Sequence, residues 1–583
     1  MQKSLKLSAA FLSILALCAG VALQRTVAQP QTKKLNVLFI VADDLNTSLS
    51  TYGDAITKSP NLDRLAKRGV KFDRAYCQYP LCSPSRTSFL SGRRPETTRI
   101  YNNATDPRTN LKDVVMLPEY FKQHGYFTAR IGKIPHDTYN SLVSWDVSED
   151  ADPSAYFVPD EDGSEVADRT KPPDAERMNY RGRTGLSRDA LLKQLKPGDE
   201  GGVPLTWRAT NTKDEDEPDG NTARRVAKLL EANQDKPFFI AAGFHKPHLP
   251  WIAPKKYFDL YPQAMMPLPA TPANDRADIP APALTHHSGD EVLTDAQRRQ
   301  AIAAYHAATS LMDAGVGILL DTLDRLKLSD NTIIVFIGDH GFHLGEHGGL
   351  WRKLTLFEEC ARTPLIVVAP KKRANVVSPR LVEFVDIYPT LAELCGLPAP
   401  VGVEGLSFAR LLDNPKQAWK KAAFTTLARR NLMGRSVRTE RYRYTEWGDE
   451  MTAELYDHQT DPHEFTNLVN DPKAAPVLAE MRKTLKEGWR AAVPASLRGA
   501  ATTGATRQTG KLEVIRSPHA RFANLPGYWL HSMGSNHMTL KSTRAPRPLY
   551  EDAVLQAPFL RDLSWTQTAT PIRSTRTALK EKQ

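Results

Sequence analysis

The chain has 583 residues, of which 41% are hydrophobic and 25% are charged, as in an ordinary globular protein. The net charge of +11 is unevenly placed: residues 498–583 hold thirteen Lys or Arg against five Asp or Glu, residues 1–28 add three basic residues, and residues 29–497 are neutral. A neutral main region without a basic, aromatic surface pattern argues against nucleic acid as a partner. Five cysteines are too few for a disulfide scaffold of this size.

The first 28 residues have the pattern of a secretory signal peptide. Lys3 and Lys6 precede an apolar run over residues 7–23, and Ala28 supplies the small residue that a signal peptidase requires. No second apolar span follows. We therefore predict cleavage near Ala28, a secreted or periplasmic protein, and no membrane span after the signal is removed.

The next segments alternate between apolar strands and amphipathic helices. Residues 35–42 form a continuous apolar run, which is typical of a strand buried on both faces of a parallel sheet. A helix is expected over residues 59–69, and a long one from Thr294, where Thr294 and Gln297 match a capping box. Further strands are expected at residues 127–131, 238–242, 332–337 and 365–369. This order predicts an α/β fold with a doubly wound, mostly parallel sheet flanked by helices.

The domain organisation follows from changes in composition. Residues 33–415 are predicted to form the large α/β domain, in which residues 150–290 contribute long loops, including a solvated acidic run at 214–219. Residues 416–497 are predicted to form a smaller C-terminal α+β subdomain with short antiparallel strands and a helix over 475–492. Residues 498–583 show little periodicity and are expected to be a loosely ordered basic tail.

Cys82 begins a short segment with helix-start signals. Ser83 is a plausible N-cap, Pro84 suits the first helical position, and Gly92 is a natural stop. A helix N-terminus favours an anion, and Arg86 adds a positive charge about one turn on. An ordinary loop cysteine before a helix is the simpler interpretation of these residues alone.

Polar residues follow several of the predicted strands, where ligands bind in doubly wound sheets. Asp43 and Asp44 end the first strand, and Asp339 and His340 end the strand at 332–337. Adjacent carboxylates repel each other unless a cation compensates their charge. Because the donors are mostly oxygen, we predict a site for Ca²⁺ or Mg²⁺ rather than for zinc.

As an ordered set, these motifs resemble the formylglycine-dependent sulfatases of the alkaline-phosphatase superfamily. Two segments, Gly92-Arg93-Arg94-Pro95-Glu96-Thr97-Thr98-Arg99 and His245-Lys246-Pro247-His248, look most like the iduronate-2-sulfatase branch. The matching segments are Val41-Ala42-Asp43-Asp44, Cys82-Ser83-Pro84-Ser85-Arg86, Ser91-Gly92-Arg93-Arg94-Pro95, Gly132-Lys133 with His136, Gly338-Asp339-His340-Gly341 and Leu350-Trp351-Arg352-Lys353.

The resemblance implies that a separate maturation enzyme oxidises Cys82 to formylglycine. One hydroxyl of the hydrated aldehyde then attacks sulfur, and the other expels sulfate. The implied metal ligands are Asp43, Asp44, Cys82, Asp339 and His340. His340 stands where many family members have Asn, which leaves Ca²⁺ as the first choice and Mg²⁺ as the second.

The resemblance also implies roles for six further residues. Arg86, Lys133 and Lys353 would balance negative charge on the nucleophile and the sulfate. His136 would accept a proton from the diol, and His245 would donate one to the leaving alkoxide. His248 is a candidate for substrate contact. The nearby His343 and His347 are expected only to line the site.

The predicted function is hydrolysis of a sulfated oligo- or polysaccharide, with a 2-O-sulfated uronate as the candidate substrate from the branch resemblance. The sulfate-binding motifs do not select the sugar, so the inserted loops are expected to do so. Two alternatives remain open at this stage: a phosphonate or phosphate ester hydrolase of the same superfamily, and an inert glycan-binding protein in which Cys82 stays a thiol.

Overall fold

The computed structural model describes residues 33–136, 139, 143–150, 205, 207–285, 293–429 and 432–497. The predicted signal peptide, the predicted tail and a large part of the inserted segment at 150–290 lie outside the described residues. The described residues all belong to one compact unit.

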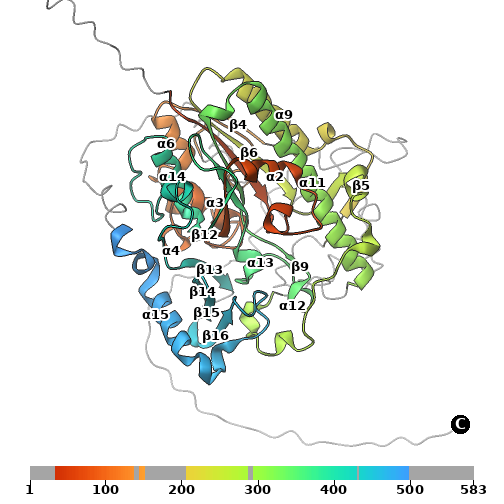
Figure 1. The fold of residues 1–583 in the computed structure, drawn as a ribbon, viewed down its shortest axis with the longest axis vertical. Coiled ribbons are helices and arrows are strands. Elements are labelled where there is room, and N and C mark those ends of the chain that lie inside the picture. The colour runs from red at the N-terminus through yellow and green to blue at the C-terminus, as the bar shows by residue number, and fades with distance from the viewer. Residues whose placement is uncertain are drawn as a thin grey trace, which may run out of the picture. The chain divides into compact units, whose positions relative to one another are not determined.

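The centre of this unit is an eight-stranded sheet (Figure 1). Its central strand β1 pairs in parallel with both β6 and β8, while β11 runs antiparallel to both of its neighbours. The predicted doubly wound, mostly parallel sheet is therefore confirmed. The strand order is β12 (Val376–Glu383), β2 (Val70–Tyr76), β11 (Leu365–Val368), β8 (Thr332–Gly338), β1 (Asn36–Asp43), β6 (Phe238–Pro247), β3 (Phe127–Gly132) and β4 (Val147–Glu149).

Helices cover both faces of the sheet and bury its apolar side chains in two separate cores. One face packs against α2 (Pro60–Arg68), α9 (Pro218–Ala232) and α11 (Asp295–Arg325). The other packs against α3 (Cys82–Ser91), α6 (Leu117–Gln123) and α14 (Ile387–Leu394). The predicted capping box of the long helix is present, because Thr294 and Gln297 bond each other's backbone N–H.

Strands β2, β4 and β12 were not predicted from the sequence. β2 carries Lys71, Asp73 and Arg74, and β12 contains Pro379, so neither shows a continuous apolar run. β12 and β4 are the edge strands, where polar side chains and proline are tolerated. The apolar signal therefore identified only the strands nearer the centre.

The C-terminal part of the described chain is a four-stranded antiparallel sheet covered by a helix, which confirms the predicted α+β character. Its strands are β13 (Ala423–Arg429), β14 (Leu432–Arg438), β15 (Tyr442–Trp447) and β16 (Asp449–Asp457). Helix α15 (Ala475–Ala492) has the predicted bounds and buries Leu478 and Met481 against this sheet. The boundary at residue 415 stays a prediction.

A buried ion-pair network joins this C-terminal sheet to the α/β domain. Lys420 Nζ lies 2.5 Å from Glu383 Oε2 and 2.6 Å from Asp386 Oδ2. Arg94 forms a bidentate pair with Glu383, with both distances at 2.7 Å. We call these four residues, two acids and two bases, the Glu383 cluster.

The remaining elements are short. Four short strands form two separate two-stranded sheets: β5 (Trp207–Thr210) pairs with β7 (Trp251–Pro254), and β9 (His343–Leu344) pairs with β10 (Trp351–Arg352). The short helices are α4 (Pro95–Thr98), α5 (Pro107–Asn110), α10 (Lys255–Phe258), α12 (Glu346–Gly349) and α13 (Glu358–Ala361).

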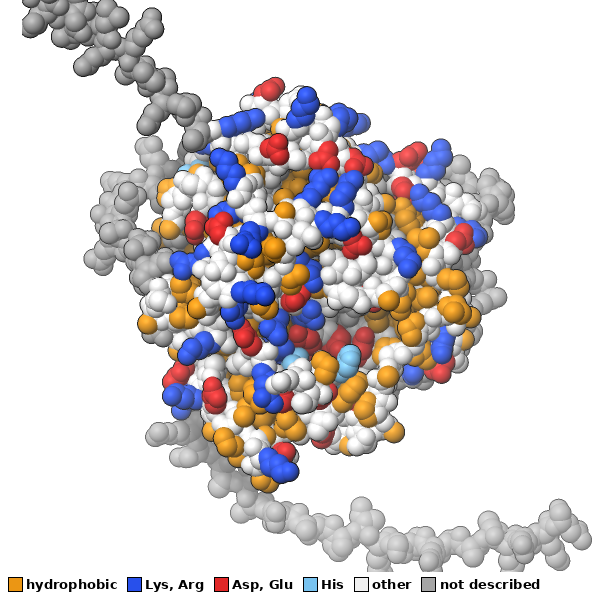
Figure 2. Space-filling view, viewed as in Figure 1, with side chains coloured by type: hydrophobic (Ala, Val, Ile, Leu, Met, Phe, Trp, Pro, Cys, Tyr) orange, Lys and Arg blue, Asp and Glu red, His pale blue; other side chains and the backbone are white. Residues whose placement is uncertain are grey.

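The acidic segment at 214–219 is not wholly the solvated loop that was predicted. Asp219 lies in the first turn of α9 and is buried, because its carboxylate accepts backbone hydrogen bonds from β6. Elsewhere, acidic and basic side chains are interspersed over the visible face of the molecule (Figure 2). Among the described helices, none combines the length and the apolar character that crossing a bilayer requires.

Candidate active site

Cys82 is the first residue of α3, and Leu81, in an extended conformation, is its N-cap. The prediction of Ser83 as the N-cap was therefore wrong by two residues. The helix start is capped from elsewhere in the chain: the Ser83 N–H donates to Asn103 Oδ1 at 2.9 Å. The helix ends as predicted at Gly92, whose φ of 66° suits glycine.

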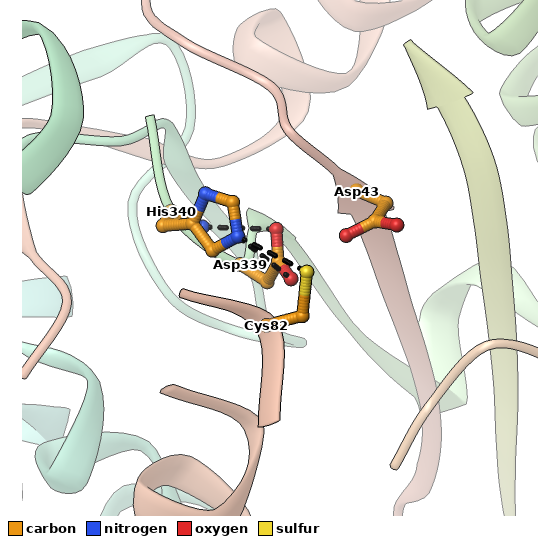
Figure 3. Close-up of side chains that lie close together, drawn as sticks. All are labelled: Asp43, Cys82, Asp339 and His340. Atoms are coloured by element: carbon orange, nitrogen blue, oxygen red, sulfur yellow. Dashed lines mark hydrogen bonds and ion pairs between the residues drawn. The ribbon is translucent and has the colours of Figure 1, made fainter. Parts of the chain in front are cut away.

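The ends of two central strands bring three carboxylates to Cys82. Asp43 and Asp44 end β1, and Asp339 and His340 follow its neighbour β8. Figure 3 shows the Cys82 sulfur directed toward Asp339 and His340, with Asp43 on the opposite side. Ser85 Oγ of α3 donates to the Asp339 carbonyl at 2.5 Å, which ties the helix to the strand end.

Three basic side chains balance the three carboxylates. Arg86 donates to Asp339 Oδ2 at 2.9 Å and to Asp43 Oδ1 at 3.2 Å. Lys133 Nζ donates to Asp43 Oδ2 at 2.6 Å. Lys353 Nζ lies 2.6 Å from Asp44 Oδ1 and 3.5 Å from Cys82 Sγ. We call this set the Cys82 cluster; its members are Asp43, Asp44, Cys82, Arg86, Lys133, Asp339, His340 and Lys353.

The donor atoms of this cluster fit a hard divalent cation. Single ligand atoms of Asp43, Cys82, Asp339 and His340 all lie within 4.8 Å of one another, and all four residues are buried. His340 Nε2 is 3.5 Å from Asp44 Oδ1 and 3.6 Å from Asp339 Oδ2. Carboxylate oxygens with one imidazole are suitable ligands for Ca²⁺ or Mg²⁺.

Burial and charge set the protonation of the cluster. Burial alone would raise the pKa of Asp43, but Lys133, His248 and Arg86 outweigh it and lower that pKa well below its usual range. Burial raises the pKa of the Cys82 thiol to about 12. The unmodified side chain is therefore a neutral thiol at physiological pH, and a poor nucleophile.

Of the two histidines around the end of β6, His245 lies in the strand and His248 follows it, and the structure brings His248 to Cys82. Its Nε2 lies 3.8 Å from Asp44 Oδ2, and it forms a second close group with Asp44 and Cys82. The Nδ1 atom is 2.6 Å from the Leu249 carbonyl, so Nδ1 carries the proton and Nε2 faces the site. The side chain is 25% exposed, and burial lowers its pKa to about 4.

The backbone of His245 is anchored to α9. The His245 N–H donates to Asp219 Oδ1 at 2.9 Å, and the Lys246 N–H donates to Asp219 Oδ2 at 2.8 Å. Asp219 is thus a buried anchor for the strand end that precedes His248. Sequence reasoning missed it because it lay in an acidic run; its place directly after Pro218, at a helix start, was the available signal.

The remaining predicted histidines lie around the cluster rather than in it. His136 shares a cavity of about 20 Å³ with Arg86 and Tyr139, on the α3 side of the site. His343 Nε2 is 2.7 Å from Thr355 Oγ1, and His347 Nδ1 is 3.1 Å from Asp275 Oδ2. Both of the latter are fully buried, and these contacts tie together the loops around the site.

Comparison with known families agrees with this arrangement. A family model described as Sulfatase matches residues 35–397. The chain is a member of the sulfatase family. A second model, described as N-sulphoglucosamine sulphohydrolase, C-terminal, matches residues 345–491. The chain is thus a sulfuric ester hydrolase, and the predicted enzyme class is confirmed.

Two characterised relatives cover most of this sulfatase. It is 34% identical to a sulfatase of Formosa agariphila, over 77% of this chain and 86% of the relative. It is 32% identical to iduronate 2-sulfatase of Homo sapiens, over 76% of this chain and 93% of the relative. The resemblance to the iduronate-2-sulfatase branch is therefore confirmed over about three quarters of this chain.

Solved structures show the same fold. A structure described as a 2-O GAG sulfatase has a TM-score of 0.59 and 25% identity, and the match covers 78% of this chain and 92% of that one. The phosphonate monoester hydrolase of Agrobacterium radiobacter has a TM-score of 0.61 and 23% identity, over 83% of this chain and all of the other. The second likeness supports the fold alone.

Proposed function

We propose that this sulfatase releases sulfate from a sulfated oligo- or polysaccharide, with a 2-O-sulfated uronate as the first candidate substrate. The observation that carries the proposal is the Cys82 cluster, in which a buried cysteine meets three carboxylates and three cationic side chains. The iduronate 2-sulfatase and 2-O GAG sulfatase relatives support the choice of sugar and position.

Residue 82 is proposed to act only after modification. A neutral thiol with a pKa near 12 does not supply a thiolate at physiological pH. After oxidation to formylglycine by a maturation enzyme and hydration, the residue would offer two hydroxyl groups, one to attack sulfur and one to release sulfate. The start of α3 and Lys353 then place positive charge beside those oxygens.

Asp43, Asp44, Asp339, His340 and the modified residue 82 are proposed to hold one divalent cation, with Ca²⁺ as the first choice and Mg²⁺ as the second. Such an ion polarises the sulfate ester and lowers the pKa of a hydroxyl bound beside it. The fully buried Arg86 holds two of these carboxylates in place, so its proposed role is to position ligands.

Lys133 and Lys353 are proposed to bind the sulfate oxygens. Both ammonium groups already face the cluster, and the Lys353 side chain keeps 15% of its surface exposed, so it is open to an incoming anion. Fixed cations at this position stabilise the negative charge that develops during sulfuryl transfer. His136, beside Arg86, is proposed as the proton acceptor in the step that releases sulfate.

His248, rather than His245, is proposed to protonate the leaving alkoxide. Its Nε2 faces Asp44 and Cys82, and its side chain is partly exposed, as contact with a substrate requires. The negative charge of a bound sulfate ester, added to that of Asp44, raises the pKa of His248 and favours the imidazolium form. His245, which the family resemblance implies as the proton donor, is the alternative: Asp219 holds its backbone N–H, and the two alanine variants described below decide between the histidines.

Expression of the full chain with a formylglycine-generating enzyme tests the proposal. We expect mass spectrometry to find formylglycine at residue 82, a new N-terminus near Ala28 in the secreted protein, and sulfate release from a 2-O-sulfated uronate disaccharide. A preference for an aryl phosphonate over the matching aryl sulfate would assign the protein to ester hydrolysis at phosphorus. A chain that retains only cysteine at residue 82 would contradict the mechanism.

A further inference from the structure

A second recess lies between the α/β domain and the C-terminal sheet. It has a volume of about 880 Å³ and is bordered by η1 (Ser50–Tyr52), β2 and the turn that joins β14 to β15. None of its lining residues belongs to the Cys82 cluster. In Figure 2, basic, acidic and histidine side chains gather around a hollow below the centre of the face, in the region where Figure 1 places α13. We call this recess the seam groove.

The seam groove is lined by more cations than anions. Three acidic residues line it, namely Asp73, Glu358 and Glu440. Five basic residues line it, namely Lys71, Arg74, Arg362, Arg438 and Arg441. The balance of these lining groups is positive, in contrast to the equal numbers of acids and bases in the Cys82 cluster.

Each lining carboxylate already has a cation of its own, so the acidic residues do not neutralise the whole groove. Two of the partners, Arg380 and Asp457, do not line the groove themselves; they pair with the lining residues Glu440 and Arg441. The four pairs are Lys71 with Asp73 at 2.7 Å, Arg438 with Glu358 at 3.4 Å, Arg380 with Glu440 at 2.6 Å and Arg441 with Asp457 at 2.6 Å.

Of the five basic residues that line the groove, two arginines are not part of these four pairs. Arg74 donates from Nη1 to the Pro379 carbonyl at 2.8 Å, and Arg362 donates from Nε to the Asp73 carbonyl at 2.7 Å. The carboxylate nearest to Arg362 is Glu358, at 4.0 Å. Within the described part of the chain, the Nη2 atoms of both arginines and Nη1 of Arg362 have no hydrogen-bond acceptor.

Unused N–H groups on a guanidinium form a planar fork that matches the oxygens of a sulfate or carboxylate group. Both forks are held in place by their backbone contacts, and the Arg362 side chain is 26% exposed, so an external anion can reach it. We infer that the seam groove is a second binding site for an anionic glycan, with Arg74 and Arg362 each receiving a sulfate or carboxylate group.

Charge and shape favour a glycan over the other anionic polymers and over the chain's own tail. The segment at 498–583 has thirteen basic and five acidic residues, so a positive groove repels it. Tyr52 offers no open ring for a nucleobase, because Lys71 Nζ lies 4.5 Å from the ring centroid. The preference for a sulfated glycan in particular rests on the proposed function.

Such a site gives a polymeric substrate a second attachment point on the enzyme. A chain held at the seam groove remains close to the protein while its sulfated residues reach the Cys82 cluster by diffusion, and this raises their effective concentration. Small sulfated substrates occupy only one site and gain nothing. Loss of the groove should therefore weaken binding of the polymer and leave turnover of a short substrate unchanged.

Equilibrium binding of dextran sulfate, with neutral dextran as the control polymer, tests the site without any turnover. We expect the double variant Arg74→Gln/Arg362→Gln to raise the Kd for dextran sulfate about tenfold, which corresponds to the loss of two charge-assisted contacts. Arg410→Gln/Lys473→Gln, at two exposed basic residues outside the groove, is the matched control for the loss of two charges and should change Kd less than about twofold.

A second variant keeps the test valid if loss of the Arg362 contact to the Asp73 carbonyl unfolds the protein. Gln459 lines the groove with an exposed side chain, so Gln459→Glu adds a negative charge and removes no side-chain hydrogen bond among the described residues. We expect it to weaken dextran sulfate binding about threefold relative to Gln234→Glu, which adds the same charge at an exposed position elsewhere.

The outcomes are distinct. Equal Kd values for the groove variants and their matched controls would overturn the site, since total charge alone would then explain binding. Tighter binding of a single-stranded DNA oligomer than of dextran sulfate, with the same sensitivity to Arg74→Gln, would overturn the choice of a glycan. Failure of the proposed sulfatase activity would appear instead as absent sulfate release from short substrates, with binding to the groove unchanged.

Discussion

The Cys82 cluster and the Glu383 cluster are both buried and both charge-balanced, yet they are built differently. In the Glu383 cluster, two bases reach two acids at 2.5 to 2.7 Å, and every charged group is used. In the Cys82 cluster, His340 Nε2 stands 3.5 Å from Asp44 and 3.6 Å from Asp339, and His248 Nε2 stands 3.8 Å from Asp44 as well. Charge balance alone therefore does not identify a functional site.

The two clusters differ in how many lone pairs and N–H donors remain available to bind a ligand. Closed ion pairs satisfy their own groups and fix two parts of the chain to each other. Carboxylate and imidazole atoms that face each other at longer distances retain lone pairs for a cation, and the nearby ammonium groups retain N–H donors for an anion. The first arrangement contributes to folding, whereas the second is suited to catalysis.

Cys82→Ala is expected to give the largest effect, a loss of activity without a loss of stability. We expect sulfate release to fall by more than about a thousandfold, because the precursor of the nucleophile is lost. Little change in thermal stability is expected, since a small neutral group is removed. Sulfate release from a disaccharide and the midpoint of thermal unfolding are the measurements; retained activity would remove Cys82 from the mechanism.

Lys420→Met is the converse change, in the Glu383 cluster. It leaves Glu383 and Asp386 buried beside each other without their shared cation, so we expect the free energy of unfolding to fall by about 3–5 kcal/mol. Turnover per folded molecule should remain within about twofold, because the ion pairs of Lys420 are made with Glu383 and Asp386 and not with a member of the Cys82 cluster. Urea unfolding and kinetics at low temperature distinguish the two effects; a large loss of kcat with unchanged stability would contradict the comparison.

His248→Ala tests the open side of the Cys82 cluster. We expect kcat/KM for an unactivated sugar sulfate to fall about a hundredfold, since general acid catalysis is lost, and to fall much less for 4-nitrophenyl sulfate, whose leaving group needs no proton. His245→Ala is the matched control, three residues earlier, and should show no such dependence on the leaving group. The opposite pattern would return the role of proton donor to His245.

The central part of this organisation could be predicted from the sequence. Residues 36–43 and 332–338 form strands buried on both faces, so their apolar runs are continuous and the polar residues after them mark one sheet edge. Asp43, Asp44, Asp339 and His340 were identified in this way, and the structure places all four near Cys82.

The features that were missed depend on contacts between distant segments. The cap of α3 comes from Asn103, and no local pattern around Ser83 reveals it. The position of His248 near Asp44 depends on the path of the chain at the end of β6, which Asp219 of α9 holds. The seam groove exists only because the C-terminal sheet packs beside β2, so neither sequence segment alone indicates it.

The smallest effect that we expect is a change in the unfolding free energy on acidification. It tests whether the Glu383 cluster stabilises the fold through its ion pairs. Burial alone would raise the pKa of Glu383, but Arg94 and Lys420 outweigh it and lower the pKa to about 2. This carboxylate therefore binds protons more readily in the unfolded chain than in the folded one. Its contribution to stability is complete above about pH 4.5 and is lost as the pH falls toward 2.

In Lys420→Met, the pKa of Glu383 rises back toward its ordinary value, so that variant loses less stability on acidification than the wild type. Burial already raises the pKa of Asp386, and loss of Lys420 raises it further. This change also reduces the stability that the variant loses on acidification. We expect the difference in unfolding free energy between the two proteins to narrow by about 1 kcal/mol between pH 6 and pH 3.5. Urea unfolding of both proteins across this range measures it, and a constant difference would mean that Lys420 does not control the protonation of Glu383.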